Sequence, residues 1–173
     1  CVAIREGVTN SGVSGALDGV AAAWPFSPAD FRRWDEEADS KGFAEPSFER
    51  HVDGAAVLAL EHLYAELLAD APSGLAVLDL CASWDSHLPA TLNASRVAAL
   101  GMNLRELEAN PVATEVYTRD LNRCPSLPFG DAAFDLVTMA LSIQYLTRPR
   151  EVFAEIHRVL RRGGLAVVAF SSR

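Results

Sequence analysis

The sequence has few cysteines and lacks any long hydrophobic run. Its 173 residues contain three cysteines, Cys1, Cys81 and Cys124. This odd, widely spaced set is typical of neither a disulfide framework nor a zinc site, and it fits a reducing compartment. The longest apolar stretches are far below the ~18–20 residues that a membrane helix needs, so we expect a soluble protein that does not span a membrane.

Positive charge is also in short supply. Fifteen Lys and Arg residues stand against 23 Asp and Glu residues, which gives a formal net charge of −8. Such a surface repels a phosphate backbone, so nucleic acid is not expected as the main ligand. The one local excess of arginines, near the C-terminal end, is interpreted as a solvated helix face.

The first 50 residues show no sustained period. The chain begins at Cys1 and not at Met, which we interpret as a processed form or a fragment whose targeting segment is already removed. Residues 1–24 are expected to form an extended or loosely ordered arm. Residues 30–38 are expected to form a short polar helix with Phe31 and Trp34 on one face. We therefore divide the chain into residues 1–50, an arm with a short helix, and residues 51–173, an α/β domain.

Strands and helices alternate in the second part. A helical stripe follows Asp53, a candidate N-cap, and ends at Pro72-Ser73-Gly74. Strands are predicted at residues 75–80, 97–100, 115–118, 134–140 and 165–170. Further helices are predicted at residues 104–109 and from Pro149 to Gly163-Gly164. This order predicts a doubly wound parallel sheet of the Rossmann-like class.

Polar residues follow the predicted strands where each one ends. In an open α/β sheet, ligands bind at this edge, so convergence there indicates a binding site. The first loop, residues 81–87, contains no glycine, which disfavours a pyrophosphate ligand and leaves a nucleoside-like ligand open. The residues at this edge, all but Gly101 and Met102 polar, are Asp79, Ser83, Asp85, Ser86, His87, Gly101, Met102, Asn103, Asp120, Asn122, Ser142, Gln144 and Tyr145.

Two segments resemble a known superfamily. Residues 129–137 (Phe-Gly-Asp-Ala-Ala-Phe-Asp-Leu-Val) are similar to the stretch that leads into the fourth strand of class I S-adenosylmethionine-dependent methyltransferases. Residues 155–164 (Glu-Ile-His-Arg-Val-Leu-Arg-Arg-Gly-Gly) are similar to the helix and glycine turn that follow. A narrower resemblance, from residue 26 onward, is to a methyltransferase-like family of plants, algae and photosynthetic bacteria with a glycine-poor first loop. It implies a plastid or other organelle as the location.

The resemblance implies a role for each residue at the predicted edge. Asp79 and Ser83 would line the methionine end of S-adenosylmethionine, and Gly101 would belong to the same cofactor site. Asn103 stands where most of the superfamily has an acid that binds the ribose hydroxyls. The remaining implied contacts are Met102 and Asp120 on the adenine, a backbone contact from Leu121, and Ser142 and Tyr145 beside the sulfonium and the substrate.

The resemblance leaves the activity open. A methyltransferase acting on a small molecule or a protein would need a base for some acceptors, and His51 and His87 are the candidates, with Tyr145 at the same site. The alternative is a catalytically inactive, methyltransferase-like scaffold subunit of a larger assembly. The chain stops after the fifth predicted strand, where the superfamily continues with a closing pair of strands, so we expect an unpaired sheet edge there.

Overall fold

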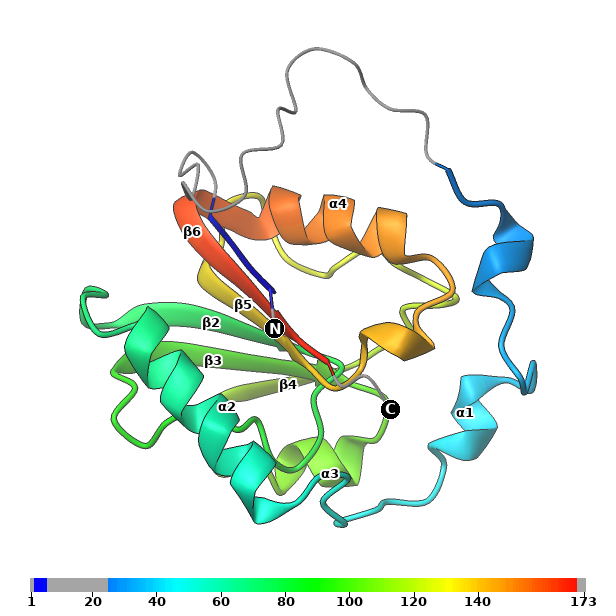
Figure 1. Ribbon diagram of the computed structural model, residues 1–173, viewed down its shortest axis with the longest axis horizontal. Coiled ribbons are helices and arrows are strands. Elements are labelled where there is room, and N and C mark those ends of the chain that lie inside the picture. The colour runs from blue at the N-terminus through cyan, green and yellow to red at the C-terminus, as the bar shows by residue number, and fades with distance from the viewer. Residues whose placement is uncertain (1, 6–24, 171–173) are drawn as a thin grey trace.

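A single six-stranded sheet forms the centre of the computed structural model, which describes residues 2–5 and 25–170 (Figure 1). Five strands run parallel, in the spatial order β6-β5-β2-β3-β4, and β1 pairs antiparallel at the β6 edge. The chain winds outward from β2 through β3 to β4 and then returns to β5 on the other side of β2. This reversal confirms the predicted doubly wound class. The strands are β1 (Val2–Arg5), β2 (Leu75–Leu80), β3 (Ala94–Gly101), β4 (Glu115–Thr118), β5 (Phe134–Ala140) and β6 (Leu160–Ala169).

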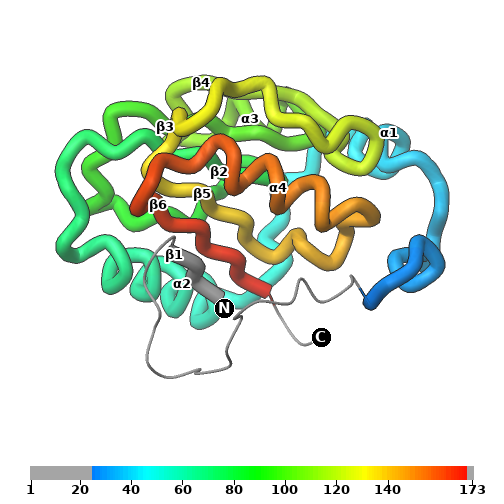
Figure 2. Tube along the Cα trace, turned by 90° about the horizontal axis from the view of Figure 1, so that it is seen from above, coloured from blue at the N-terminus to red at the C-terminus, as the bar shows by residue number. Residues whose placement is uncertain are grey.

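Helices cover both faces of the sheet (Figures 1 and 2). On one face lies α2 (Gly54–Leu67), which begins at the predicted N-cap, since Asp53 Oδ1 accepts a 2.9 Å hydrogen bond from Ala56 N. On the other face lies α4 (Pro149–Val159), which starts with proline as predicted. A short helix, α3 (Leu104–Glu108), follows β3.

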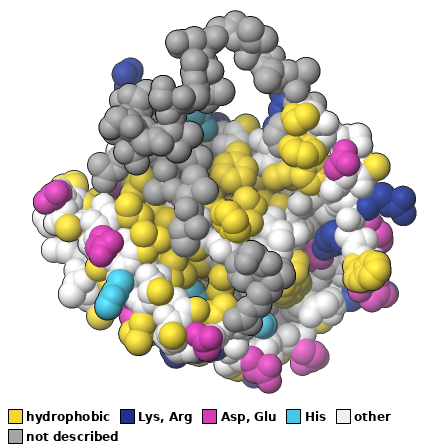
Figure 3. Space-filling view, viewed as in Figure 1, with side chains coloured by type: hydrophobic (Ala, Val, Ile, Leu, Met, Phe, Trp, Pro, Cys, Tyr) yellow, Lys and Arg dark blue, Asp and Glu magenta, His cyan; other side chains and the backbone are white. Residues whose placement is uncertain are grey.

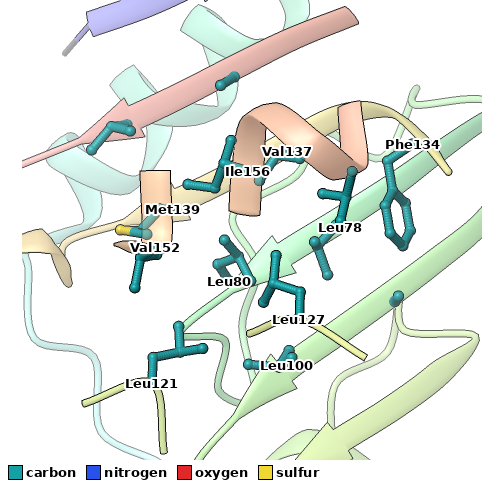
Figure 4. Close-up of a cluster of buried hydrophobic side chains, with 14 of the residues drawn as sticks. Leu78, Leu80, Leu100, Leu121, Leu127, Phe134, Val137, Met139, Val152 and Ile156 are labelled. Carbon is teal, nitrogen blue, oxygen red and sulfur yellow. The ribbon is translucent and has the colours of Figure 1, made fainter. Parts of the chain in front are cut away.

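The core is divided by the sheet into two clusters. All six residues of β2 are buried, as expected for a strand covered on both faces. Figure 4 shows the cluster beneath α4, in which Val152 and Ile156 pack on Leu80 and Val137. On the opposite face, Leu60 and Tyr64 of α2 pack on the other side chains of the strands.

Three expectations are wrong. Residues 30–38 do not form one helix: a 3₁₀ turn spans Pro28–Phe31, α1 spans Asp39–Gly42, and Trp34 is fully exposed. Acidic side chains bind backbone N–H groups here, as when Asp35 accepts from Glu37 N, and such bonds compete with a helix. The last helix ends at Val159, four residues before the predicted glycine turn, and β6 begins at once.

The third correction concerns the sheet edge. The edge beside β6 is paired, because β1 lies antiparallel to it from Val2 opposite Val168 to Arg5 opposite Leu165. Residue 1 and residues 6–24 of the predicted arm lie outside the described residues.

Residues 39–50, which we call the strap, lie across the side of the molecule where the parallel strands end (Figure 1). Polar bonds fasten the strap to the domain. Asn122 Nδ2 donates to Asp39 Oδ2 at 2.8 Å, and Ser47 N donates to Glu106 Oε1 at 2.7 Å. The predicted boundary at residue 50 stays a prediction, while these bonds join residues on both sides of it.

The described helices are all short of the length and apolarity needed to cross a bilayer; the longest, α2, has 14 residues.

Candidate functional site

A cavity of about 660 Å³ lies between the strap and the carboxyl ends of β2, β3 and β5. We call it the main cavity. Its position at the point where the strand order reverses is where open α/β sheets bind their ligands. Its volume falls in the range of pockets for small molecules and cofactors.

The structure brings all but one of the predicted site residues to this cavity. Those that line it are His51, Asp79, Ser83, His87, Gly101, Met102, Asp120, Leu121, Ser142 and Tyr145. They come from the ends of four strands and from His51, which directly follows the strap, and the sequence separates them by up to 94 positions. Their roles stay predictions, but their convergence on one cavity is a property of the fold.

Asn103 is the residue that does not line the main cavity. It is the N-cap of α3, where its Oδ1 accepts from Arg105 N and Glu106 N at 3.0 and 3.3 Å. Its Nδ2 donates to the carbonyl oxygens of Phe43 and Ala44 in the strap. Both ends of the amide are thus engaged within the protein, which differs from the predicted contact with ribose hydroxyls.

Asp79 is the buried acid of the site. It is 3% exposed, and its Oδ1 accepts a 2.8 Å hydrogen bond from Thr138 Oγ1 of the neighbouring strand. Burial raises the pKa of Asp79 to about 6, and the hydroxyls of Ser86 and Thr138 oppose the shift. Such a perturbed carboxyl at the mouth of a cavity is typical of a functional site.

The glycine-free loop after β2 is held in place by side chains of α3 and the turn after it. Ser83 Oγ donates to Glu106 Oε2 at 2.6 Å, and Asn110 Nδ2 donates to Ser83 O and Ser86 Oγ, each at 2.8 Å. Gly101 lets the loop approach β3: a Cβ there would lie 2.1 Å from Ala82 O. In other sheets of this kind, glycines within the loop allow it to pack closely. Here side-chain hydrogen bonds hold the loop, and a glycine on the neighbouring strand leaves room for it.

Three residues other than glycine have a left-handed backbone conformation, with positive φ, at the main cavity. Cys81, His87 and Leu141 have φ values of 54°, 53° and 56°. Each such conformation costs of the order of 1–2 kcal/mol, and strain of this kind concentrates at binding sites.

Asp120 and Glu106 present carboxylates at the cavity from different elements. Asp120 Oδ1 accepts from Asn122 N and Arg123 N at 2.9 and 3.2 Å, while its Oδ2 has no hydrogen bond to any described residue. Glu106 is buried at 8% exposure and was not predicted as a site residue. The sequence does contain a signal for it, because Glu106 stands three residues after the N-cap Asn103 in capping-box spacing.

A polar cluster surrounds Asp85 at one wall. His87 Nδ1 lies 3.3 Å from Asp85 Oδ1, and Arg50 Nη2 lies 3.3 Å from Asp85 Oδ2. Arg50 also lies over the ring of Trp84, 5.7 Å from its centroid. Asp85 Oδ1 accepts a 3.0 Å hydrogen bond from His87 N, whereas His87 Nδ1 has no hydrogen-bond partner among the described residues. The imidazole of His87 is thus close to a carboxylate without being held by it, while His51 is exposed. Within residues 25–170 no three His, Cys, Asp or Glu residues are placed to hold a metal ion.

The charges of the cavity wall fit S-adenosylmethionine. Two guanidinium groups, Arg50 and Arg119, line it against the carboxylates of Asp39, Glu45, Glu49, Asp79, Asp85, Glu106 and Asp120. An acidic wall attracts a sulfonium and an ammonium and repels a pyrophosphate. The charged side chains of the cavity wall therefore suit a cationic nucleoside and not a dinucleotide.

Comparisons of sequence agree with this geometry. Residues 89–168 match the family model described as a methyltransferase domain. The C-methyltransferase of ubiquinone and menaquinone biosynthesis from Roseobacter denitrificans is 49% identical over 47 residues, which are 27% of this chain and 19% of that protein. The malonyl-[acyl-carrier protein] O-methyltransferase of Laribacter hongkongensis is 39% identical over 82 residues, 47% of this chain and 26% of that protein. The matched part is thus about a fifth to a quarter of the length of these curated relatives.

Comparisons of structure concern the fold. A [4+2]-cyclase, SpnF, superposes with a TM-score of 0.55 and 23% identity, covering 75% of this chain and 53% of that chain. A Haloferax volcanii complex of a methyltransferase and its activator Trm112 gives a TM-score of 0.52 and 23% identity, with 68% of this chain and 57% of that chain covered. The chain has the Rossmann-like fold of the class I methyltransferases, and nearly half of it, residues 89–168, matches their methyltransferase-domain family.

Proposed function

We propose that this chain binds S-adenosylmethionine in the main cavity and transfers its methyl group to an acceptor. The observation that carries the proposal is the acidic cavity at the carboxyl ends of β2, β3 and β5, in a fold whose second half matches a methyltransferase domain. Fold alone does not decide the reaction, since a cyclase shares it.

Each residue has a stated part in this proposal. When bound, S-adenosylmethionine supplies an electrophilic methyl group on a sulfonium. Asp79 and Ser83 contact its methionine part, and Asp120 Oδ2 accepts from the adenine amino group. Met102 packs on the adenine, and Ser142 and Tyr145 lie beside the sulfonium. His87, whose imidazole lies 3.3 Å from the carboxylate of Asp85, accepts a proton from the acceptor.

A second candidate is a non-catalytic scaffold subunit. It is favoured by Asn103, whose amide is engaged by the strap where a catalytic relative would hold ribose. One structural neighbour comes from a complex that contains the methyltransferase activator Trm112, which adds support for assembly with a partner. The narrower plant, algal and photosynthetic-bacterial family, and location in a plastid, stay predictions from the resemblance.

Ligand-induced thermal stabilisation tests the proposal. S-adenosylmethionine or its demethylated product at ~100 times the dissociation constant adds about 2.7 kcal/mol to stability. For a domain of this size that corresponds to a rise in Tm of about 5–10 °C. NAD, which carries a pyrophosphate, is expected to give no rise.

A matched pair of variants assigns the site. Asp120→Asn keeps the Oδ1 acceptor for Asn122 N but weakens the contact to the adenine amino group, so we expect about tenfold weaker binding of S-adenosylmethionine. The exposed Asp70→Asn should bind as the wild type does. No rise in Tm at millimolar S-adenosylmethionine would overturn the proposal in favour of the scaffold.

A further inference from the structure

A second cavity, of about 710 Å³, adjoins the main one. We call it the outer cavity. Residues 30–43 form one wall, and residues 143–149, which lead from β5 into α4, form the other. Six residues line both cavities, among them Phe43 of the strap and Gln144 and Tyr145 of the turn after β5.

We propose that the outer cavity binds the methyl acceptor, and that this acceptor is an uncharged ring compound. The inference rests on the proposed function, because an acceptor must bring its nucleophilic atom to about 3–3.5 Å from the methyl carbon. A cavity that shares a wall with the cofactor's cavity meets that requirement.

Aromatic rings provide the first argument for the ligand class. Phe31, Trp34, Phe43 and Tyr145 line the outer cavity. Trp34 is 102% exposed, Tyr145 55% and Phe43 43%, so these rings keep large faces open to solvent. In Figure 3 hydrophobic side chains lie among charged ones on this side of the molecule. Exposed rings around a hollow offer offset and edge-to-face contacts to another ring.

The charged groups in the wall provide the second argument, because most of them are already paired and acidic groups are in excess. Arg33 pairs with Asp39, and Asp39 also accepts from Asn122 Nδ2. Asp30 accepts from Ser27 N and Oγ at 2.7 Å, and Glu37 pairs with Lys41 at 2.7 Å. Arg32 also lines the wall and has no ion pair with a described residue. The four carboxylates, those of Asp30, Asp35, Glu37 and Asp39, nevertheless outnumber the two guanidinium groups and repel a phosphate or a carboxylate. An uncharged acceptor is therefore favoured over a phosphate-bearing carrier.

The transfer step is that of a hydroxyl acceptor. Transfer to a hydroxyl oxygen of such a ring compound forms a carbon–oxygen bond, breaks the methyl–sulfur bond with both electrons kept by sulfur, and releases the hydroxyl proton.

The test uses 2-naphthol as the probe and 2-naphthalenesulfonate as its charged counterpart, with binding followed by saturation-transfer NMR on the intact chain. We expect 2-naphthol to bind and the sulfonate to bind at least tenfold more weakly. Trp34→Ala removes a fully exposed ring from the outer cavity only, and should weaken 2-naphthol binding at least fivefold. Phe170→Ala, an exposed aromatic residue outside both cavities, should leave it unchanged.

Binding of S-adenosylmethionine separates the two proposals. Trp34→Ala should keep the full thermal shift with S-adenosylmethionine, because Trp34 does not line the main cavity. A normal shift combined with 2-naphthol binding that is absent, or that ignores Trp34→Ala, overturns the inference about the acceptor. Absence of the shift in the wild type overturns the proposed function instead.

Discussion

Asp79 illustrates at the scale of one residue how the site conflicts with the stability of the core. Its carboxyl is buried at the end of the central strand, beside Tyr64 and Cys81, and burial raises the pKa of all three groups. Ionising it in this place is unfavourable, since only two hydroxyls oppose the desolvation. The protein keeps a charge here that a purely structural residue would avoid.

Replacing Asp79 with Asn should therefore stabilise the protein at neutral pH. The pKa of Asp79 is about 6 in the folded protein against an ordinary value of 3.8, so the neutral carboxyl's stabilising contribution is complete below pH ~4. It is lost as pH rises to about 6, and amounts to about 3 kcal/mol at 1.36 kcal/mol per unit. We expect the free energy of unfolding of Asp79→Asn, minus that of the wild type, to rise across this window in urea titrations.

The exposed Asp70→Asn serves as the matched control and should follow the wild type within about 0.5 kcal/mol at every pH. Asp79→Asn should also bind S-adenosylmethionine more weakly. A pH-independent difference between Asp79→Asn and the wild type would contradict the burial argument.

Sequence reasoning works for single residues when the signal is local. The strand ends placed Asp79, Ser83, Met102 and Asp120 at one edge, and the structure gathers them at the main cavity. The hydrogen-bond partners of Asn103 could not be predicted from the sequence, because Phe43 and Ala44 lie about 60 positions away. The spacing of residues in the sequence does not indicate to which distant backbone carbonyl a side-chain amide will donate a hydrogen bond.

At the scale of elements, α4 fixes the loop that leads into β5. Arg158 donates to Glu155, to Asp131 and to the carbonyl oxygens of Phe129 and Leu127. Glu155 Oε2 in turn accepts from Leu127 N at 2.7 Å. One guanidinium and one carboxylate thus satisfy several backbone groups of a segment without regular structure.

Arg158→Lys should loosen this loop although it keeps the charge. A lysine ammonium cannot reproduce the planar fork that serves several acceptors at once, so we expect a loss of about 1–2 kcal/mol in the free energy of unfolding. Arg162→Lys, at an exposed position in β6, is the control and should change it by less than about 0.5 kcal/mol. Equal effects of the two substitutions in urea titrations would refute a special role for Arg158.

The elements with a clear period could be predicted from the sequence. The predicted strands at residues 75–80, 115–118 and 134–140 have the observed bounds, since apolar runs between turn residues define them. The prediction of a helix at residues 30–38 was wrong because Phe31 and Trp34 alone make no buried stripe, and Trp34 is fully exposed. Local bonds from acidic side chains decide that segment instead.

At the scale of the whole molecule, distant segments complete both the sheet and the main cavity. The strap closes the cavity through polar bonds to α3 and to the loop after β4, and β1 covers the edge of β6. No local pattern indicates that residues 2–5 pair with a strand some 160 positions later. Long-range pairing of this kind is decided by which edges the rest of the fold leaves open.

Removing residues 1–5 should therefore expose β6 and promote self-association. The residues of β6 from Leu165 to Ala169 are buried, and without β1 their backbone groups would offer an open edge to another chain. We expect a loss of about 1–3 kcal/mol in stability, from a few backbone hydrogen bonds, and oligomers that grow with protein concentration in light scattering. Ala3→Thr, which places a residue of higher strand propensity in β1, should remain monodisperse to the same extent as the wild type. A truncated chain that matches the wild type in both measurements would show that the sheet does not depend on β1.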